Sequence, residues 1–106
     1  ELAPEFMQGA TLEYDQKKAF EGADFIYAKN WSSYEEYGQI LSQDKKWMID
    51  KAKMNLTNNA KFMHCLPVRR NVIVSDEVID SENSIVMQQA AHRVTSANLV
   101  LRKLIG

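Results

Sequence analysis

The segment 62–71 holds the residue types in this chain that are best suited to chemistry. Its sequence, Phe-Met-His-Cys-Leu-Pro-Val-Arg-Arg-Asn, reads as an apolar strand that stops at a proline. Cys65, the only cysteine of the chain, stands at the exit of this strand, and two arginines follow it. Open α/β sheets bind their ligands outside the carboxyl ends of the strands. A thiol, exposed backbone carbonyls and fixed positive charges at such an end predict a site for a small, polar, anionic substrate.

Cys65 has two interpretations. Nearby cations favour the nucleophilic thiolate form of a cysteine, whereas a free cysteine is commonly a small buried apolar side chain. His64 directly precedes it, and successive side chains of a strand point to opposite faces. The two residues therefore do not form a Cys–His dyad of the protease kind, which needs hydrogen-bond reach between them.

Pro67 and four basic residues are further candidates for the site. The proline removes a ladder donor, so the carbonyls of the two preceding residues can face a cleft, although a proline that only ends the strand is the alternative. Arginine matches a carboxylate or phosphate with two hydrogen bonds. Arg69 and Arg70 are adjacent, so at most one of them faces the cleft easily. Lys29 ends another apolar run, and Arg93 lies just outside the apolar stripe of the last predicted helix; each could equally be a solvated surface cation.

The elements expected before the third strand follow an α/β order. They are a strand over 11–14, a helix over 16–21, a nearly continuous apolar strand over 24–29 and a loop over 30–43. Asp15 is suited to cap the helix and Gly22 to stop it. The apolar run predicts a strand that is buried on both faces, as in parallel sheets.

The second half of the chain predicts one strand and three helices. Asp44 and Asp50 could each cap a helix that ends near 58–59, and Asp50 is preferred, with 47–49 extended before it. Residues 61–66 form the third strand, and Ser75 caps a short helix over 76–80. From Ile85 onward, apolar residues recur at spacings of three and four and predict a long amphipathic helix. The residues of this stripe are Met87, Ala90, Val94, Ala97, Leu101 and Leu104.

Length and composition limit the class of protein. A chain of 106 residues is one small domain, and 45% apolar with 25% charged residues is an ordinary globular mixture. A net charge of −1 gives no reason to expect a nucleic-acid or membrane partner. One cysteine allows neither an internal disulfide nor a cysteine-based metal site, so a cytoplasmic protein is expected. The chain opens in mid-pattern without a methionine, and we expect it to be a piece of a longer protein.

Two motifs together resemble the transcarbamylases. They are His64-Cys65-Leu66-Pro67 and the Gln-Ala-x-x-Arg segment that ends at Arg93 and opens the last helix. The segments 27–31 and 66–71 are similar to the branch that acts on N-acylated ornithine, the N-acetylornithine and N-succinylornithine carbamoyltransferases. The similarity extends over essentially all of the chain.

The resemblance implies a fold, partners and a division of the chain. Enzymes of this family enclose the active site between two α/β domains, one for carbamoyl phosphate and one for the amino acid, and they are trimers that need neither a cofactor nor a metal. Residues 1–84 are similar to part of the amino-acid domain, a partial doubly wound, Rossmann-like parallel sheet with helices on both faces. Residues 85–106 are similar to the long C-terminal helix that packs back on the other domain. The implied substrates are carbamoyl phosphate and an N-acylated ornithine, in arginine biosynthesis.

The resemblance also implies roles for individual residues. Cys65 would lie beside the attacking amine, and its carbonyl together with that of Leu66 would hold the carbamoyl NH2, next to a cis peptide before Pro67. Arg93 matches the arginine that contacts the carbamoyl and phosphate oxygens. The residues expected to bind substrate are Lys29, His64, Cys65, Leu66, Arg69 and Arg93, of which Lys29 and Arg69 would grip the α-carboxylate.

Departures from the family pattern leave alternatives open. Ile73 stands where acetylornithine enzymes place a lysine, which favours the succinylornithine type, and His92 stands where the family often has asparagine. Ornithine carbamoyltransferase proper and a non-catalytic binding or assembly module remain the alternatives, while a nucleotide-binding domain lacks its glycine fingerprint. Alone, the chain is expected to be inactive and to self-associate through its uncovered helix face or sheet edge.

Overall fold

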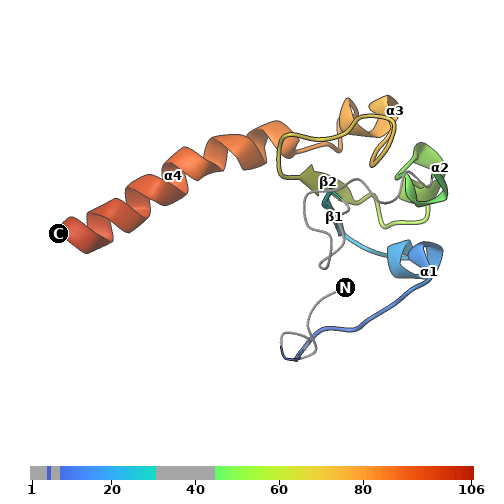
Figure 1. Ribbon diagram of the computed structural model, residues 1–106, viewed down its shortest axis with the longest axis horizontal. Coiled ribbons are helices and arrows are strands. Elements are labelled where there is room, and N and C mark those ends of the chain that lie inside the picture. Colours follow the sequence, from blue (N-terminus) through green and yellow to red (C-terminus); the bar gives the residue numbers. More distant parts are fainter. Residues whose placement is uncertain (1–4, 6–7, 31–44) are drawn as a thin grey trace, which may run out of the picture.

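The computed structural model describes residue 5, residues 8–30 and residues 45–106 of the chain. Its elements are, in order, α1 (Gln16–Phe20), β1 (Phe25–Ala28), the 3-10 helix η2 (Lys45–Trp47), α2 (Lys51–Met54), β2 (Lys61–His64), α3 (Asp76–Ile79) and α4 (Val86–Ile105). The short elements gather into a small body, and α4 leaves this body as a long arm (Figure 1). Among the described helices, none combines the length and apolar content that crossing a bilayer would require.

β1 and β2 form a parallel sheet, and β2 has a neighbour along each of its edges. On one edge Ala28 lies opposite His64, so the two strands reach the same level at their carboxyl ends. On the other edge Ser84 forms a parallel bridge with Phe62. The parallel α/β arrangement expected from the sequence is thereby confirmed, with β2 between β1 and the bridge at Ser84.

A cluster of buried apolar side chains joins the short elements to the sheet. Phe62 and Val74 are completely inaccessible at its centre, and Val86 is the one residue of α4 that it includes. The members are Phe20, Ile26, Ala28, Ile49, Ala60, Phe62, Ile73, Val74, Val78, Ile79 and Val86. The core therefore fixes the first residue of α4 and leaves the remainder of that helix outside.

The prediction that the strand at 24–29 is buried on both faces is wrong. β1 alternates between exposed and buried residues, with Ile26 and Ala28 in the core and Phe25 and Tyr27 at 64% and 57% exposure. Apolar run length cannot distinguish a doubly buried strand from one that shows aromatic side chains on one side. Within the described residues, nothing covers the side on which Phe25 and Tyr27 lie.

Two of the predicted helix caps are confirmed by hydrogen bonds. The Asp15 carboxylate accepts from the backbone N–H groups of Lys17 and Lys18, at 3.0 and 3.4 Å. The Asp50 carboxylate accepts from the N–H of Lys53 at 2.9 Å. Ser75 stands at the N-cap of α3 as predicted, but its side chain makes no capping bond. Gly22 follows α1 with a φ of 69°, a left-handed conformation that favours glycine at helix ends.

Several element boundaries differ from the predictions. α2 ends at Met54 instead of near 58–59, because the Thr57 hydroxyl donates to the Met54 carbonyl (2.6 Å) and accepts from the Ala60 N–H (3.0 Å), which turns the chain toward β2. β2 ends at His64 instead of residue 66. Residues 45–47 are helical, so of the predicted extended segment only Ile49 pairs, with Val74.

The predicted strand over 11–14 is absent. These residues are exposed and form no ladder with any strand in the described part of the chain. A strand needs a neighbour to satisfy its backbone groups, and β-favouring residue types alone do not supply one. The predicted loop lies outside the described residues from position 31 to 43, as does the alternative cap Asp44.

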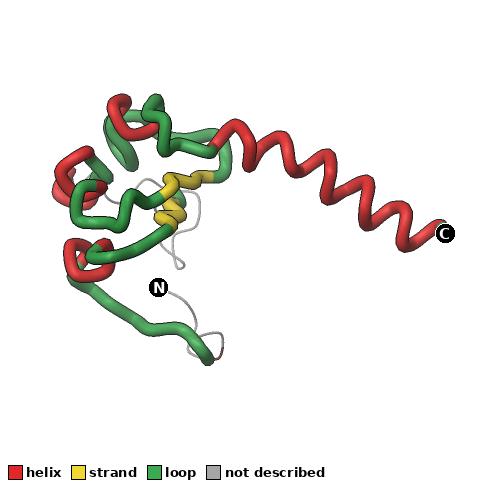
Figure 2. Tube along the Cα trace, turned by 180° about the vertical axis from the view of Figure 1, so that it is seen from behind, coloured by secondary structure: helices red, strands yellow, loops and turns green. Residues whose placement is uncertain are grey.

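α4 confirms the predicted long amphipathic helix. It runs unbroken for 20 residues, and Figure 2, a view from the opposite side, shows it extending away from the short elements. The predicted stripe is uncovered: Met87 and Leu104 are 70% and 77% exposed. In most folded proteins an apolar stripe of this length is buried. Its exposure here indicates that the helix packs against another protein surface.

We predict different changes in stability for substitutions at two N-cap positions. Asp50→Ala should lower the free energy of unfolding of the chain by about 1 kcal/mol, because the Lys53 N–H loses its acceptor. Ser75→Ala should leave it unchanged or slightly raised, because the Ser75 hydroxyl oxygen is buried without a hydrogen-bond partner among the described residues. Urea denaturation of both variants measures the difference, and equal losses would contradict it.

Candidate functional site

The exit of β2 forms the first wall of the candidate site. Cys65 follows the last strand residue and is exposed. The peptide bond between Leu66 and Pro67 is cis, as the motif resemblance implied. The Asn30 side-chain NH2 donates to the Pro67 carbonyl at 3.1 Å. The turn after β2 is therefore tied to the residues that leave β1.

His64 is buried beneath this exit. Its side chain is completely inaccessible, whereas Cys65 is exposed, which confirms that the two side chains take opposite directions. The Nδ1–H of His64 donates to the Cys65 carbonyl, because a carbonyl can only accept. Burial lowers the pKa of His64, and this hydrogen bond only partly opposes the effect. The imidazole is thus held neutral as a support for the backbone of Cys65.

A small cleft of about 110 Å³ lies between the β2 exit and the first turns of α4. Its lining comprises His64, Cys65, Leu66, Gln89, Ala90 and Arg93. Cys65 and Arg93, separated by more than a fifth of the chain, therefore share one cavity. The first turn of α4 is held there by a hydrogen bond of 3.1 Å from the His64 N–H to Gln89 Oε1.

The two adjacent arginines have different surroundings. Arg70 donates to Asp76 and Asp80, with three contacts of 2.9 Å. The Asp80 and Asp76 carboxylates raise the pKa of Arg70. In turn, Asn71 and then Arg70 lower the pKa of Asp76, and Arg70 lowers that of Asp80.

Arg70 therefore belongs to a cluster that joins the loop after β2 to α3. Of the pair, Arg69 is the arginine that has no ion pair with a carboxylate in the part of the chain that the structure describes. That one arginine of this pair faces a ligand stays a prediction.

Lys29 and Arg69 do not line the cleft between Cys65 and Arg93. Lys29 follows Ala28, which pairs with His64, so it leaves β1 at the level where Cys65 leaves β2. It is exposed, and Arg69 is half-buried. Lys29 thus lies at the carboxyl edge of the sheet, Arg69 lies in the loop after β2, and both are outside the small cavity.

Gln89 and Asn30 were not singled out from the sequence. Gln89 stands in the Gln-Ala-x-x-Arg segment, one helical turn before Arg93, and this spacing was the available signal. Asn30 carried no signal, because its bond to Pro67 joins positions that only the fold brings together.

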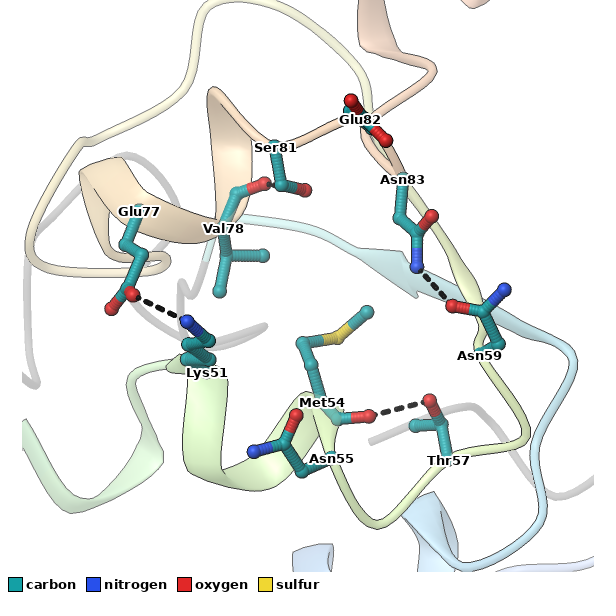
Figure 3. A pocket seen from close by; sticks show the side chains of 10 residues that line it. All are labelled: Lys51, Met54, Asn55, Thr57, Asn59, Glu77, Val78, Ser81, Glu82 and Asn83. Carbon is teal, nitrogen blue, oxygen red and sulfur yellow. Dashed lines mark hydrogen bonds and ion pairs between the residues drawn. The ribbon is translucent and has the colours of Figure 1, made fainter.

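A larger groove of about 510 Å³ lies elsewhere, between α2 and α3. Figure 3 shows that its polar walls are bonded to one another: Lys51 pairs with Glu77 at 3.1 Å, and Asn83 donates to Asn59 at 2.7 Å. It contains none of the candidate residues. In the described ranges, no three His, Cys, Asp or Glu side chains gather as a metal site.

Comparison with known proteins relates the chain to carbamoyltransferases. The family model "Aspartate/ornithine carbamoyltransferase, Asp/Orn binding domain" matches residues 3–104. N-succinylornithine carbamoyltransferase of Bacteroides thetaiotaomicron is 62% identical over 99% of this chain and 34% of its own length. N-acetylornithine carbamoyltransferase of Xylella fastidiosa is 39% identical over 91% of this chain and 31% of its own length. The chain thus spans about a third of the length of these relatives.

The fold is similar to a solved structure of this kind. A variant of N-acetyl-L-ornithine transcarbamylase, complexed with carbamyl phosphate and N-succinyl-L-norvaline, superposes with a TM-score of 0.85. It is 33% identical and covers 99% of this chain and 37% of its own.

We predict that stability depends on pH through His64. Because the pKa of His64 is lowered from 6.5 in the folded chain, the unfolded state binds the proton first. Stability should be fully present above pH 6.5 and fall as the pH drops below it. Denaturation midpoints between pH 7.5 and 5 measure this slope. It should flatten in His64→Asn, which keeps an N–H donor, and persist in His92→Asn, where the exposed histidine is changed; the reverse pattern would contradict the assignment.

Proposed function

Since the chain belongs to the aspartate/ornithine carbamoyltransferase family, we propose that it forms the amino-acid-binding part of an enzyme acting on an N-acylated ornithine. The enzyme would transfer the carbamoyl group of carbamoyl phosphate to the side-chain amine of that acceptor, in arginine biosynthesis. The observation that carries the proposal is the cavity shared by Cys65 and Arg93. It pairs a group for the attacking amine with a cation for the carbamoyl oxygen.

The reaction asks for charge stabilisation and alignment. The neutral amine attacks the carbamoyl carbon, the new carbon–nitrogen bond forms, the carbon–oxygen bond to phosphate breaks, and the amine gives up a proton. Negative charge grows on the carbamoyl and phosphate oxygens, and the Arg93 guanidinium would stabilise it. Holding both reactants in line supplies much of the remaining acceleration.

The backbone after β2 would hold the other end of the carbamoyl group. Carbonyl oxygens of Cys65 and Leu66 are acceptors suited to its NH2. The Cys65 carbonyl already accepts from His64 Nδ1, but a carbonyl has a second lone pair that remains available. The part of His64 in substrate binding is therefore to fix the direction of this carbonyl. Cys65 Sγ would lie beside the amine itself.

The acceptor's α-carboxylate would be gripped by Lys29 and Arg69. Lys29 lies at the carboxyl edge of the sheet, and Arg69 follows β2 and has no carboxylate partner among the described side chains. An arginine fork suits a carboxylate with two hydrogen bonds, and a lysine adds a point charge.

The acyl group is proposed to be succinyl. The relative that is 62% identical is an N-succinylornithine carbamoyltransferase, whereas an N-acetylornithine enzyme is 39% identical. Ile73 is 1% exposed and lies in the apolar core, so this position offers no cation to the acceptor.

The arrangement of α4 is the basis for a proposed division of the chain between two domains. Residues 1–84 would form part of the amino-acid domain, and residues 85–106 would pack on a carbamoyl phosphate domain. The exposed stripe of α4 supports this division, since such a face is suited to another domain. We further propose a cytoplasmic homotrimer for the intact enzyme and no activity for this chain alone.

The test is turnover by the full-length protein that carries this chain. With carbamoyl phosphate, we expect a citrulline-type product from N-succinylornithine, formed faster than from N-acetylornithine or from ornithine. Light scattering of the same preparation should give three times the subunit mass. An absence of turnover with all three acceptors would refute the proposed activity, and faster turnover of ornithine would refute the N-acyl assignment.

Two substitutions test the shared cavity. Arg93→Ala should lower kcat by about 100-fold or more, because a charge at the developing oxyanion is lost. Cys65→Ala should lower kcat as well while leaving the fold intact, as judged by circular dichroism. Arg102→Ala is the matched control, because it removes an exposed arginine of the same helix far from the cavity. A wild-type rate in Arg93→Ala would remove that residue from the site.

A further inference from the structure

The edge of β2 that faces α4 is hydrogen-bonded in an unusual way. The Phe62 N–H donates to the Asn83 carbonyl and the Phe62 carbonyl accepts from the Ile85 N–H, both at 2.9 Å, as in a parallel ladder. The next rung would run from the His64 N–H to the Ile85 carbonyl. In the structure that carbonyl belongs to the helix instead: it accepts the first hydrogen bond of α4, from the Gln89 N–H at 2.9 Å.

The side chain of Gln89 supplies the missing rung. Its Oε1 accepts from the His64 N–H at 3.1 Å, so a side-chain amide occupies the place of a strand carbonyl. His64 is completely inaccessible, and a buried N–H without an acceptor is costly. Gln89 thus allows the chain to leave the ladder and begin a helix at Ile85 while β2 stays satisfied to its last residue.

This bond also sets the direction in which α4 starts. Ile85 at the N-cap makes no side-chain capping bond, and the core reaches only as far as Val86. The Gln89–His64 bond therefore fixes the first turn of the helix against the end of β2. Arg93 lies four residues after Gln89 on the same side of the helix, and both line the small cleft with Cys65.

We propose that Gln89 is a positioning residue: by completing the ladder of β2, it sets the distance of the Arg93 guanidinium from Cys65 and Leu66. The link to catalysis rests on the proposed function, whereas the link between Gln89 and the start of α4 does not. Gln89 itself needs no contact with substrate in this role.

The first test compares neighbouring glutamines in the full-length protein. Gln89→Met keeps the length and helix preference of the side chain but removes the acceptor. Gln88→Met makes the same change at an exposed position on another side of the helix. We expect Gln89→Met to lower kcat by about 10- to 100-fold, with KM for the acceptor changed by less than about threefold, because misplacement affects the aligned transition state most. Gln88→Met should match the wild type, and equal rates in the two variants would overturn the proposal.

A double substitution tests whether Gln89 acts through Arg93. If it does, Gln89→Met should cost less than about threefold further in an Arg93→Ala background, because the group being positioned is gone. A merely structural role would give losses that multiply. Multiplying losses would therefore overturn the positioning role even if Gln89→Met alone is slow.

Hydrogen exchange separates this inference from the proposed activity. In the full-length protein, Gln89→Met should speed the exchange of the His64 amide and of the first turn of α4, and Gln88→Met should not. Gln89→Glu keeps an acceptor and should restore protection at His64. Unchanged protection in Gln89→Met overturns the inference whatever the activity is. If the wild-type protein shows no carbamoyl transfer, the proposed function is refuted, and so is the proposal that Gln89 positions Arg93 for catalysis. The exchange rates would still decide whether Gln89 fixes the start of α4.

Discussion

Hydrogen bonding along both edges of β2 is the constraint on which this structure depends. The strand is four residues long and its alternate residues Phe62 and His64 are completely buried, so its backbone groups cannot turn to water. β1 supplies partners on one edge, and residues 83–85 together with Gln89 supply them on the other. The segments that supply these partners must lie beside β2. The candidate residues belong to these segments or follow them directly, so they are placed near the end of β2 as well.

The same requirement explains why one end of the sheet collects groups from distant parts of the sequence. Parallel strands in register finish at one level, which brings Lys29 and Cys65 to a common edge. The Asn30–Pro67 hydrogen bond joins the two exits, and the turn into α4 brings Arg93 over the second of them. No element needs to be long for this to happen. The geometry comes from the strand register, the Asn30–Pro67 hydrogen bond and one glutamine.

Local features were predicted well because their causes are local. The caps at Asp15 and Asp50, the opposite directions of His64 and Cys65 and the long helix at the end all follow from neighbouring residues. The pairing of Cys65 with Arg93 in one cavity came from a family resemblance, since Arg93 alone is an ordinary helix-surface arginine.

Features that depend on distant partners were missed. Residues 11–14 have the composition of a strand but no neighbour in the described structure, and Phe25 and Tyr27 are apolar yet exposed. Gln89 was not predicted because a glutamine in a helix is normally a surface residue. Its proposed role depends on a β2 N–H group that has a side-chain acceptor in place of a strand carbonyl, and no local sequence pattern reveals this.

The ion pairs of Arg70 have an electrostatic consequence for a charged ligand that approaches the end of the sheet. Its guanidinium is shared between the carboxylates of Asp76 and Asp80, so these three described side chains together carry one negative charge in excess. An approaching anion is repelled by this acidic cluster and attracted by the cations Lys29, Arg69 and Arg93. Although the chain as a whole is nearly neutral, we therefore expect its charges to favour one orientation of a ligand with separate negative groups before any direct contact is made.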